Sequence, residues 1–262
     1  MERGYKRMSY ETLIYEKQDK IAVITLNRPE CLNAFNNISF QEIKAAVIEA
    51  GEDPSIRVIV LKGSERAFSA GDDIKYMTSG AVTDGDVWTA LMQECVGEIS
   101  RCKKPVIAAV SGVAMGGGFE LALMCDMIYV AEGTKLALPE IKIGAIPICG
   151  GISKVAKCAG AKWAKYLAMT GDPITPELAF QLGLIQKVVP ADKLLEEILI
   201  LAGKLAMMPV EMLAVVKRVA DISEDMTNER GLIAERDYMN YISKIGVGAE
   251  AAKAWMAAKS KK

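Results

Sequence analysis

The sequence predicts an α/β fold, in which a core of alternating strands and helices is followed by a helical C-terminal part. Two observations lead to this prediction. Short apolar runs rich in β-branched residues alternate with helical stretches up to about residue 190. From Pro173 onward, apolar residues recur at helical spacing over most of the remaining residues. With 262 residues, the chain is long enough to bury a large core without a metal or a disulfide framework.

The predicted elements alternate along the chain in the order expected for this class. The strands are short runs in which nearly every residue is apolar, and the helices carry apolar residues three or four positions apart. The predicted strands are residues 21–26, 58–61, 106–110, 127–131 and 136–138. The predicted helices are residues 38–51, 116–125, 175–182, 193–207, 210–219, 229–243 and 248–258.

The chain contains no histidine. This absence excludes Ser-His-Asp triads, Cys-His pairs and zinc sites that depend on histidine. Acid–base chemistry near neutral pH must therefore use glutamate, aspartate, lysine, tyrosine or cysteine side chains with shifted pKa values, or backbone groups.

Charge and cysteine usage restrict the partners and the compartment. The formal net charge is −1, so no global field attracts nucleic acid or an anionic membrane. The six cysteines include no C-x-x-C pair, and no run approaches the ~20 apolar residues of a membrane span. We expect a reduced, soluble, cytoplasmic protein without a nucleic-acid or membrane partner. A basic cluster near the end fits either a solvated tail or a phosphate contact: Lys253, Lys259, Lys261 and Lys262.

The glycine run Gly116-Gly117-Gly118 is the densest local signal. It follows a predicted strand and opens a predicted helix that carries Glu120. Free backbone N–H groups at a helix start point toward whatever lies there, and glycines allow another molecule to approach the main chain closely. The run fits neither a dinucleotide fingerprint nor a P-loop. Tight helix–strand packing explains the glycines equally well.

Two further segments carry carboxyl groups. In Ala70-Gly71-Asp72-Asp73, the two aspartates are candidate metal ligands, but no other carboxylates at ligand spacing accompany them. We therefore predict no metal site and expect one aspartate to cap a helix. In Leu138-Pro139-Glu140, a glutamate stands in an apolar stretch, where a buried carboxylate is costly unless it is paired or protonated. A surface turn is the alternative for this segment.

Together these segments resemble the enoyl-CoA hydratase (crotonase) family, collinearly along nearly the whole chain. The similarity also includes Leu26-Asn27-Arg28-Pro29, Leu32-Asn33-Ala34, Gly183-Leu184-Ile185 and Val188-Val189-Pro190. The resemblance implies a crotonase-like spiral of ββα units at residues 1–190, which holds the active site. It also implies a helical oligomerisation region at residues 191–262 that builds a homotrimer, or a hexamer of two trimers.

The implied reaction is reversible hydration of a trans-2-enoyl-CoA to a 3-hydroxyacyl-CoA, as in fatty-acid β-oxidation. It needs no metal or redox cofactor, because coenzyme A enters as part of the acyl-CoA substrate. By resemblance, the backbone N–H groups of Asp72 and Gly117 form an oxyanion hole for the thioester oxygen, and the Asp72 side chain is free to point away. Glu120 and Glu140 are the implied acid–base pair, one drawing a proton from water while the other protonates C2.

The resemblance also implies contacts with coenzyme A. Lys75 is expected near the phosphates, and Arg28 with Leu32 near the nucleotide. Trp255 matches an aromatic residue that approaches the adenine bound by a neighbouring subunit, and Lys259 is the best candidate for a further phosphate contact. Residues 76–92 are expected to flank the acyl tail. The remaining predicted substrate contacts are Ala70, Asp73 and Ile74.

The chain departs from the family pattern after Pro147. Where relatives commonly have Pro-Gly-x-Gly-Gly, it has Ile148 and Cys149 before the glycine pair. Ile148 keeps an N–H for the water, but its side chain is expected to narrow the acyl pocket. The alternatives are an enoyl-CoA delta-isomerase, a hydratase of a cyclic or otherwise specialised unsaturated acyl-CoA, and a non-enzymatic RNA-binding protein. Both glutamates argue against the isomerase, and the near-zero net charge argues against RNA binding.

Overall fold

Six strands form the main sheet of the computed structural model, which describes residues 10–259. Their order across the sheet is β1-β2-β3-β4-β6-β8. Only β1 pairs antiparallel with its neighbour, and the other pairs are parallel. The strands are β1 (Leu13–Gln18), β2 (Ile21–Leu26), β3 (Val58–Lys62), β4 (Val106–Val110), β6 (Met127–Ala131) and β8 (Lys187–Val189). A separate parallel pair consists of β5 (Val113–Met115) and β7 (Lys135–Ala137).

Helices fill the connections and the C-terminal part, as predicted. In chain order they are α1 (Asn37–Glu52), α2 (Ile74–Thr78), α3 (Gly85–Arg101), α4 (Gly117–Leu123), α5 (Gly151–Ala159), α6 (Ala161–Thr170), α7 (Pro176–Gln181), α8 (Leu194–Ala206), α9 (Val210–Ser223), α10 (Asn228–Lys244) and α11 (Val247–Lys259). Three short 3-10 turns are η1 (Pro29–Cys31), η2 (Glu140–Ile143) and η3 (Ala191–Lys193). The α/β class with a helical C-terminal region is therefore confirmed.

The central strands of the main sheet, such as β3 and β4, are buried on both faces, which explains why they lack polar alternation, whereas the edge strand β1 is largely exposed. Strand β3 shows this directly. Ile59 and Leu61 join the core that contains helices α1, α3 and α4, whereas Val58 and Val60 face the opposite side. That second face is covered by α8 through its buried residues, which are Leu194, Ile198, Ala202 and Ala206.

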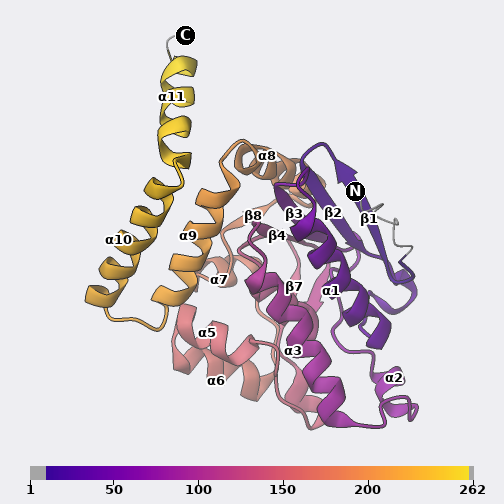
Figure 1. Cartoon of the computed structure of the whole chain (residues 1–262). Coiled ribbons are helices and arrows are strands. Elements are labelled where there is room, and N and C mark those ends of the chain that lie inside the picture. Colours follow the sequence, from indigo (N-terminus) through magenta and orange to yellow (C-terminus); the bar gives the residue numbers. More distant parts are fainter. Residues whose placement is uncertain (1–9, 260–262) are drawn as a thin grey trace.

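The last helices extend away from the α/β body. Figure 1 shows α10 lying alongside α9 and α11 continuing past it, so that α11 projects beyond the rest of the molecule. Helix α8, in contrast, packs on the sheet, although the predicted division at residue 190 groups it with the oligomerisation region. Packing against the sheet thus continues to Ala206, and the helices that leave the body begin with α9.

No single helix of residues 10–259 is long and apolar enough to cross a membrane. One strongly bent pair, residues 191–206 with Val210–Ser223, meets the length and composition criteria together. The first member of that pair contains α8, whose apolar face already covers the sheet.

The small sheet positions the candidate site. Strand β4 leads through Ser111 and Gly112 into β5, and β5 leads directly into α4. Its partner β7 leads into η2, which begins at Glu140. Because β5 and β7 run parallel, their carboxyl ends meet at one edge and bring α4 and η2 together.

Candidate active site

The segment at residues 68–72 runs alongside β5 and the start of α4. The N–H of Met115 donates to the Ser69 carbonyl at 3.0 Å, and Ser69 forms an isolated parallel bridge with Ala114. Contact is so close at Gly118 that a Cβ there would lie 2.5 Å from the Ser69 carbonyl oxygen. Gly118 is therefore required by packing, and this packing also brings the two predicted oxyanion-hole residues together.

Two backbone N–H groups converge at this junction. The parallel bridge between Phe35 and Asp72 uses the Gly71 carbonyl and the Asp73 N–H, each at 2.8 Å, so the Asp72 N–H points away from Phe35. Gly117 is the first residue of α4, and its N–H has no acceptor within the helix. Neither group donates a hydrogen bond to any of residues 10–259.

Gly71 permits the close approach of these two groups. Its φ is +89°, and a Cβ added there would lie 2.6 Å from the Met115 carbonyl oxygen and 3.3 Å from the Gly117 nitrogen. A side chain at this position would therefore separate the segment that carries Asp72 from the start of α4.

Glu120 lies on α4 and is only 1% exposed. Its Oε1 accepts hydrogen bonds from the N–H of Cys149 at 2.7 Å and of Gly151 at 2.8 Å. Burial raises the pKa of Glu120, and these backbone donors oppose that rise. Of the buried carboxyl groups in this site, Glu120 has the surroundings best suited to the ionised form.

Glu140 is also buried, with 7% of its surface exposed, but its surroundings differ. Neither carboxyl oxygen has a hydrogen-bond partner among the described residues. Oε1 lies 3.1 Å from the point that a Cβ of Gly116 would occupy. Burial, together with the charges of Glu120 and Asp72, raises the pKa of Glu140 to about 7. Glu140 is thus a carboxylic acid that keeps its proton up to neutral pH.

The Asp72 side chain, which the sequence left free to point away, has its Oδ1 beside the start of α4. Its Oδ1 is buried without a partner among residues 10–259 and lies 3.1 Å from the position of a Gly117 Cβ. Burial and the charge of Glu120 raise its pKa to about 7. The bridge between Asp72 and Phe35 fixes the backbone here and, with it, the direction of the side chain.

The predicted coenzyme A contacts near α2 form one loop structure. Arg28 pairs with Asp73 at 3.1 Å, and Asp73 caps α2 by accepting the N–H of Tyr76 at 3.1 Å. Capping by one aspartate of the pair is therefore confirmed. Leu32 accepts the Ala70 N–H at 2.9 Å, while Ile74 and Lys75 are exposed on α2. These residues lie in one region, with Arg28 and Asp73 engaged with each other.

Trp255 and Lys259 lie elsewhere. Both are on α11, where the Lys259 ammonium stands 4.1 Å from the centre of the Trp255 ring. Helix α11 and the α2 region lie at opposite ends of the molecule in Figure 1. One chain therefore does not bring Trp255 to a ligand held beside Lys75.

Comparison with known proteins decides the family. The family model described as enoyl-CoA hydratase/isomerase matches residues 16–252. The chain belongs to the enoyl-CoA hydratase/isomerase family. A probable enoyl-CoA hydratase of Rhizobium meliloti is 40% identical over 232 residues, covering 87% of this chain and 88% of the relative. A crotonyl-CoA hydratase of Syntrophomonas wolfei is 39% identical over 199 residues, covering 76% of each chain.

Solved structures of this family share the fold. The enoyl-CoA hydratase of Thermoplasma volcanium superposes with a TM-score of 0.86 at 29% identity, covering 93% of this chain and 97% of that one. The similarity therefore includes the C-terminal helices as well as the α/β body. It confirms the crotonase fold that the motifs predicted.

Sequence reasoning missed the residues that hold Glu120. Cys149 and Gly151 supply backbone N–H groups, and the Gln93 amide on α3 donates to the Ile148 carbonyl at 3.0 Å. The Ile148 side chain packs against the main hydrophobic core. The glycine pair before α5 was the available signal, because a Cβ on Gly151 would lie 3.0 Å from Glu120 Oε1.

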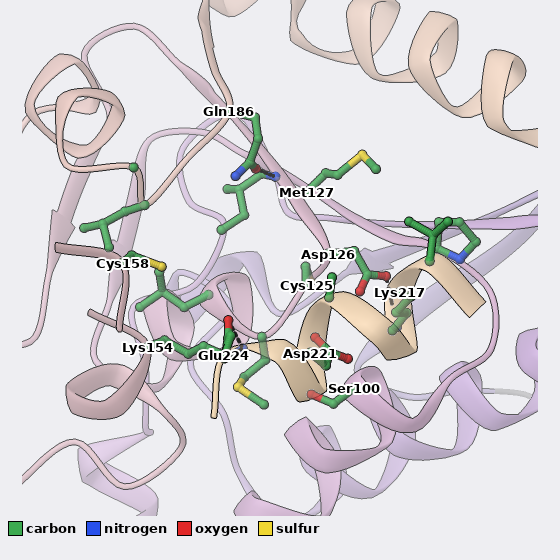
Figure 2. Close-up of a pocket in the computed structure, with 18 of the residues that line it drawn as sticks. Ser100, Cys125, Asp126, Met127, Lys154, Cys158, Gln186, Lys217, Asp221 and Glu224 are labelled. Carbon is green, nitrogen blue, oxygen red and sulfur yellow. Dashed lines mark hydrogen bonds and ion pairs between the residues drawn. The ribbon is translucent and has the colours of Figure 1, made fainter. Parts of the chain in front are cut away.

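A cavity of about 340 Å³ lies away from these carboxyl groups, beneath α9 (Figure 2). None of the predicted site residues lines it. Its charged side chains pair with each other: Lys217 with Asp126 at 3.0 Å, and Lys154 with Glu224 at 3.3 Å. No group of three or more cysteine, aspartate or glutamate residues suited to a metal occurs within residues 10–259. The cavity separates the C-terminal helices from the body.

Proposed function

We propose that this protein catalyses the reversible hydration of a trans-2-enoyl-CoA to a 3-hydroxyacyl-CoA. The observation that carries the proposal is a pair of buried glutamates in contrasting surroundings, beside two free backbone N–H groups. Glu120 accepts two backbone hydrogen bonds, whereas Glu140 accepts none from the described residues. This difference gives the site one base and one acid near neutral pH.

The backbone groups provide the electrostatic part of the reaction. Addition of water at C3 moves negative charge through C2 onto the thioester oxygen. The free N–H groups of Asp72 and Gly117 suit an oxygen bound between them. One such donor typically stabilises the transition state by ~2.7–4 kcal/mol.

The glutamates provide the proton transfers. Ionised Glu120 takes a proton from the attacking water as the water oxygen bonds to C3. Neutral Glu140 gives its proton to C2, and the carbon–carbon double bond becomes a single bond. Glu120 has gained one proton and Glu140 has lost one, so the two carboxyl groups together still hold a single proton. No metal or redox cofactor takes part in the proposed reaction, and coenzyme A is only the carrier of the acyl group.

The proposed site takes an acyl-CoA with its thioester at the N–H groups and its nucleotide beside the loop of Arg28, Leu32 and Lys75. The aromatic series Phe35, Phe40, Trp88 and Tyr76, with ring centres 5.1–5.7 Å apart, supports an apolar wall for the acyl tail. Tyr76 and Trp88 of this proposed wall belong to residues 76–92, the segment expected to flank the acyl tail.

We propose a homotrimer, or a hexamer of two trimers, because Trp255 and Lys259 reach a bound coenzyme A only from a second subunit. The exposed apolar side chains of α10 and α11 support this assembly; they include Leu232, Met239, Tyr241, Trp255 and Met256. A cytoplasmic location and the absence of nucleic-acid and membrane partners remain predictions.

The test is loss of the absorbance of a conjugated enoyl thioester on addition of the purified protein. A panel of short, long and cyclic enoyl-CoA substrates would define the acyl group. Incorporation of heavy oxygen from labelled water into the product distinguishes hydration from double-bond isomerisation. If no enoyl-CoA in the panel gains water, the proposed reaction is wrong.

A further inference from the structure

The proposed reaction uses only the backbone of Asp72, yet its side chain is a third carboxyl group in the site. Its Oδ1 is buried and accepts no hydrogen bond from residues 10–259. An unpartnered buried polar atom is costly, and at a catalytic site a bound substrate can supply the missing hydrogen bond. The thioester oxygen is the substrate atom expected closest to this carboxyl, because the Asp72 N–H itself faces that oxygen.

The position of the carboxyl supports this role. Oδ1 stands 3.1 Å from the Cβ position of Gly117, the residue whose N–H is the other half of the hole. The ring of Phe35 also lies near this point, with Cδ2 at 3.8 Å. The side chain is thus held beside the two backbone donors.

The charge state of Asp72 decides whether its side chain stabilises or repels the negative thioester oxygen. An ionised carboxylate would repel the negative oxygen that forms in the reaction, whereas a neutral carboxylic acid is a hydrogen-bond donor, a role known in other oxyanion holes. Three ionisable groups face Asp72 from other elements: Glu120 on α4, Glu140 on η2 and the buried thiol of Cys149. All three are neutral or negative, and the neighbouring Arg28 is engaged with Asp73. These surroundings favour the neutral form, in agreement with the raised pKa of Asp72.

We propose that the neutral Asp72 carboxyl donates a third hydrogen bond to the thioester oxygen and is a catalytic residue of the oxyanion hole. The inference rests on the hydratase function proposed above. Hydration then requires a proton on Asp72 as well as on Glu140. Activity at high pH is lost through two deprotonations instead of one.

The test compares Asp72→Asn, Asp72→Ala and the wild type in crotonyl-CoA hydration from pH 5.5 to 9. Asp192→Asn, an exposed aspartate on η3, is the matched control. We expect Asp72→Ala to lower kcat by roughly 10²–10³-fold at pH 6, the loss typical of one oxyanion donor. Asp72→Asn keeps a donor at every pH, so it retains most of the activity at pH 6. At high pH the activity of Asp72→Asn should fall with the loss of one proton, from Glu140. The activity of the wild type should fall with the loss of two protons, from Glu140 and Asp72.

Binding of acetoacetyl-CoA provides a second readout, because its enolate carries the same negative oxygen and absorbs in the near ultraviolet. Asp72→Ala should bind this enolate more weakly than the wild type, and Asp72→Asn should not. An Asp72→Ala variant that equals or exceeds the wild type in rate and enolate binding overturns the inference alone. A folded wild type that neither hydrates any enoyl-CoA nor binds acetoacetyl-CoA overturns the proposed function together with it.

Discussion

Three carboxyl groups share one buried site, and their hydrogen bonds distinguish them. Glu120 accepts two backbone N–H groups, whereas Glu140 and the Oδ1 of Asp72 accept no hydrogen bond from residues 10–259. Backbone donors stabilise the ionised form of a carboxyl, and burial without donors stabilises the neutral form. The site therefore titrates as a coupled group in which the negative charge resides mainly on Glu120.

The first prediction concerns the two glutamates. Glu120→Gln and Glu140→Gln should each lower kcat by about 10²–10⁴-fold, because each removes one proton transfer while keeping the side-chain shape. Binding of coenzyme A thioesters should change little, and this can be measured by calorimetry. Glu132→Gln, in the exposed turn after β6, is the control. Undiminished turnover in either active-site variant would exclude that residue from the reaction.

The second prediction concerns stability and pH. The pKa of Glu140 is about 7 in the folded protein, against an ordinary value of 4.5. Between these pH values the folded state binds more protons than the unfolded state, so the stability contributed by this group falls as pH rises. The glutamine of the Glu140→Gln variant cannot ionise. Between pH 5 and pH 8, the free energy of unfolding of this variant should therefore fall by roughly 1–3 kcal/mol less than that of the wild type.

Denaturant unfolding of both proteins at the two pH values measures this difference. A fall in stability equal in both proteins would mean that Glu140 ionises freely in the folded state. The Asp72 carboxyl has the same sign of shift, so part of the wild-type pH dependence should remain in the variant.

At the scale of elements, the site depends on the contact between the segment at 68–72 and the β5–α4 turn. Four backbone or near-backbone contacts define it: Met115 with Ser69, Ser69 with Ala114, Gly118 with Ser69, and Gly71 with Met115. Glycine is needed wherever a Cβ would meet the opposing backbone. Small shifts in this contact change the separation of the two N–H groups directly.

The third prediction uses two glycines with similar backbone angles. Gly71 has φ +89° and Gly133 has φ +75°, so alanine at either position should cost about 1–2 kcal/mol in backbone strain. Only at Gly71 does a Cβ meet other atoms, whereas at Gly133 none lies within 4 Å. Gly71→Ala should therefore lose more stability than Gly133→Ala, and it alone should lose most hydratase activity.

Thermal unfolding and crotonyl-CoA turnover of the two variants check this prediction. Equal losses of stability would mean that the loop at Gly71 relaxes without separating from α4. Full activity in Gly71→Ala would show that the two N–H groups need not be held at this spacing.

At the scale of the whole molecule, α10 and α11 place Trp255 far from the loop of Arg28 and Lys75 (Figure 1). Trp255 is 61% exposed, which is unusual for a large aromatic side chain without a partner surface. The proposed contact with a second subunit would account for both features. The proposed catalytic groups, in contrast, all come from one chain.

The fourth prediction follows from this separation. Trp255→Ala should raise KM for crotonyl-CoA several-fold with little change in kcat, because it removes a contact with the nucleotide and leaves the reacting atoms unchanged. The same variant should hydrate crotonyl-pantetheine, which lacks the nucleotide, as well as the wild type does. Sedimentation equilibrium should give three or six times the chain mass of 28.3 kDa. A monomer with unchanged KM in the variant would contradict the subunit-shared site.

The sequence alone determined the fold class, many of the elements and, through the family resemblance, the acid–base candidates. Continuous apolar runs such as residues 106–110 indicate strands buried on both faces, and the absence of histidine directs attention to the glutamates. Strand β5 and the backbone donors to Glu120 were not predicted, because their signals are short and depend on contacts distant in the chain. Strands β1 and β8 and helices α3, α5 and α6 were not predicted either. Element bounds differ from the predicted ones by only a few residues.

Only the tertiary structure decided which carboxyl groups accept hydrogen bonds. The sequence does not show which of Glu120 and Glu140 is ionised. They differ because the N–H groups of residues 149 and 151 donate to Glu120 and not to Glu140. The direction of the Asp72 side chain was decided in the same way, by its bridge to Phe35. The physical reason is that a pKa depends on burial, charges and donors close in space, and those are set by packing between segments far apart in the chain.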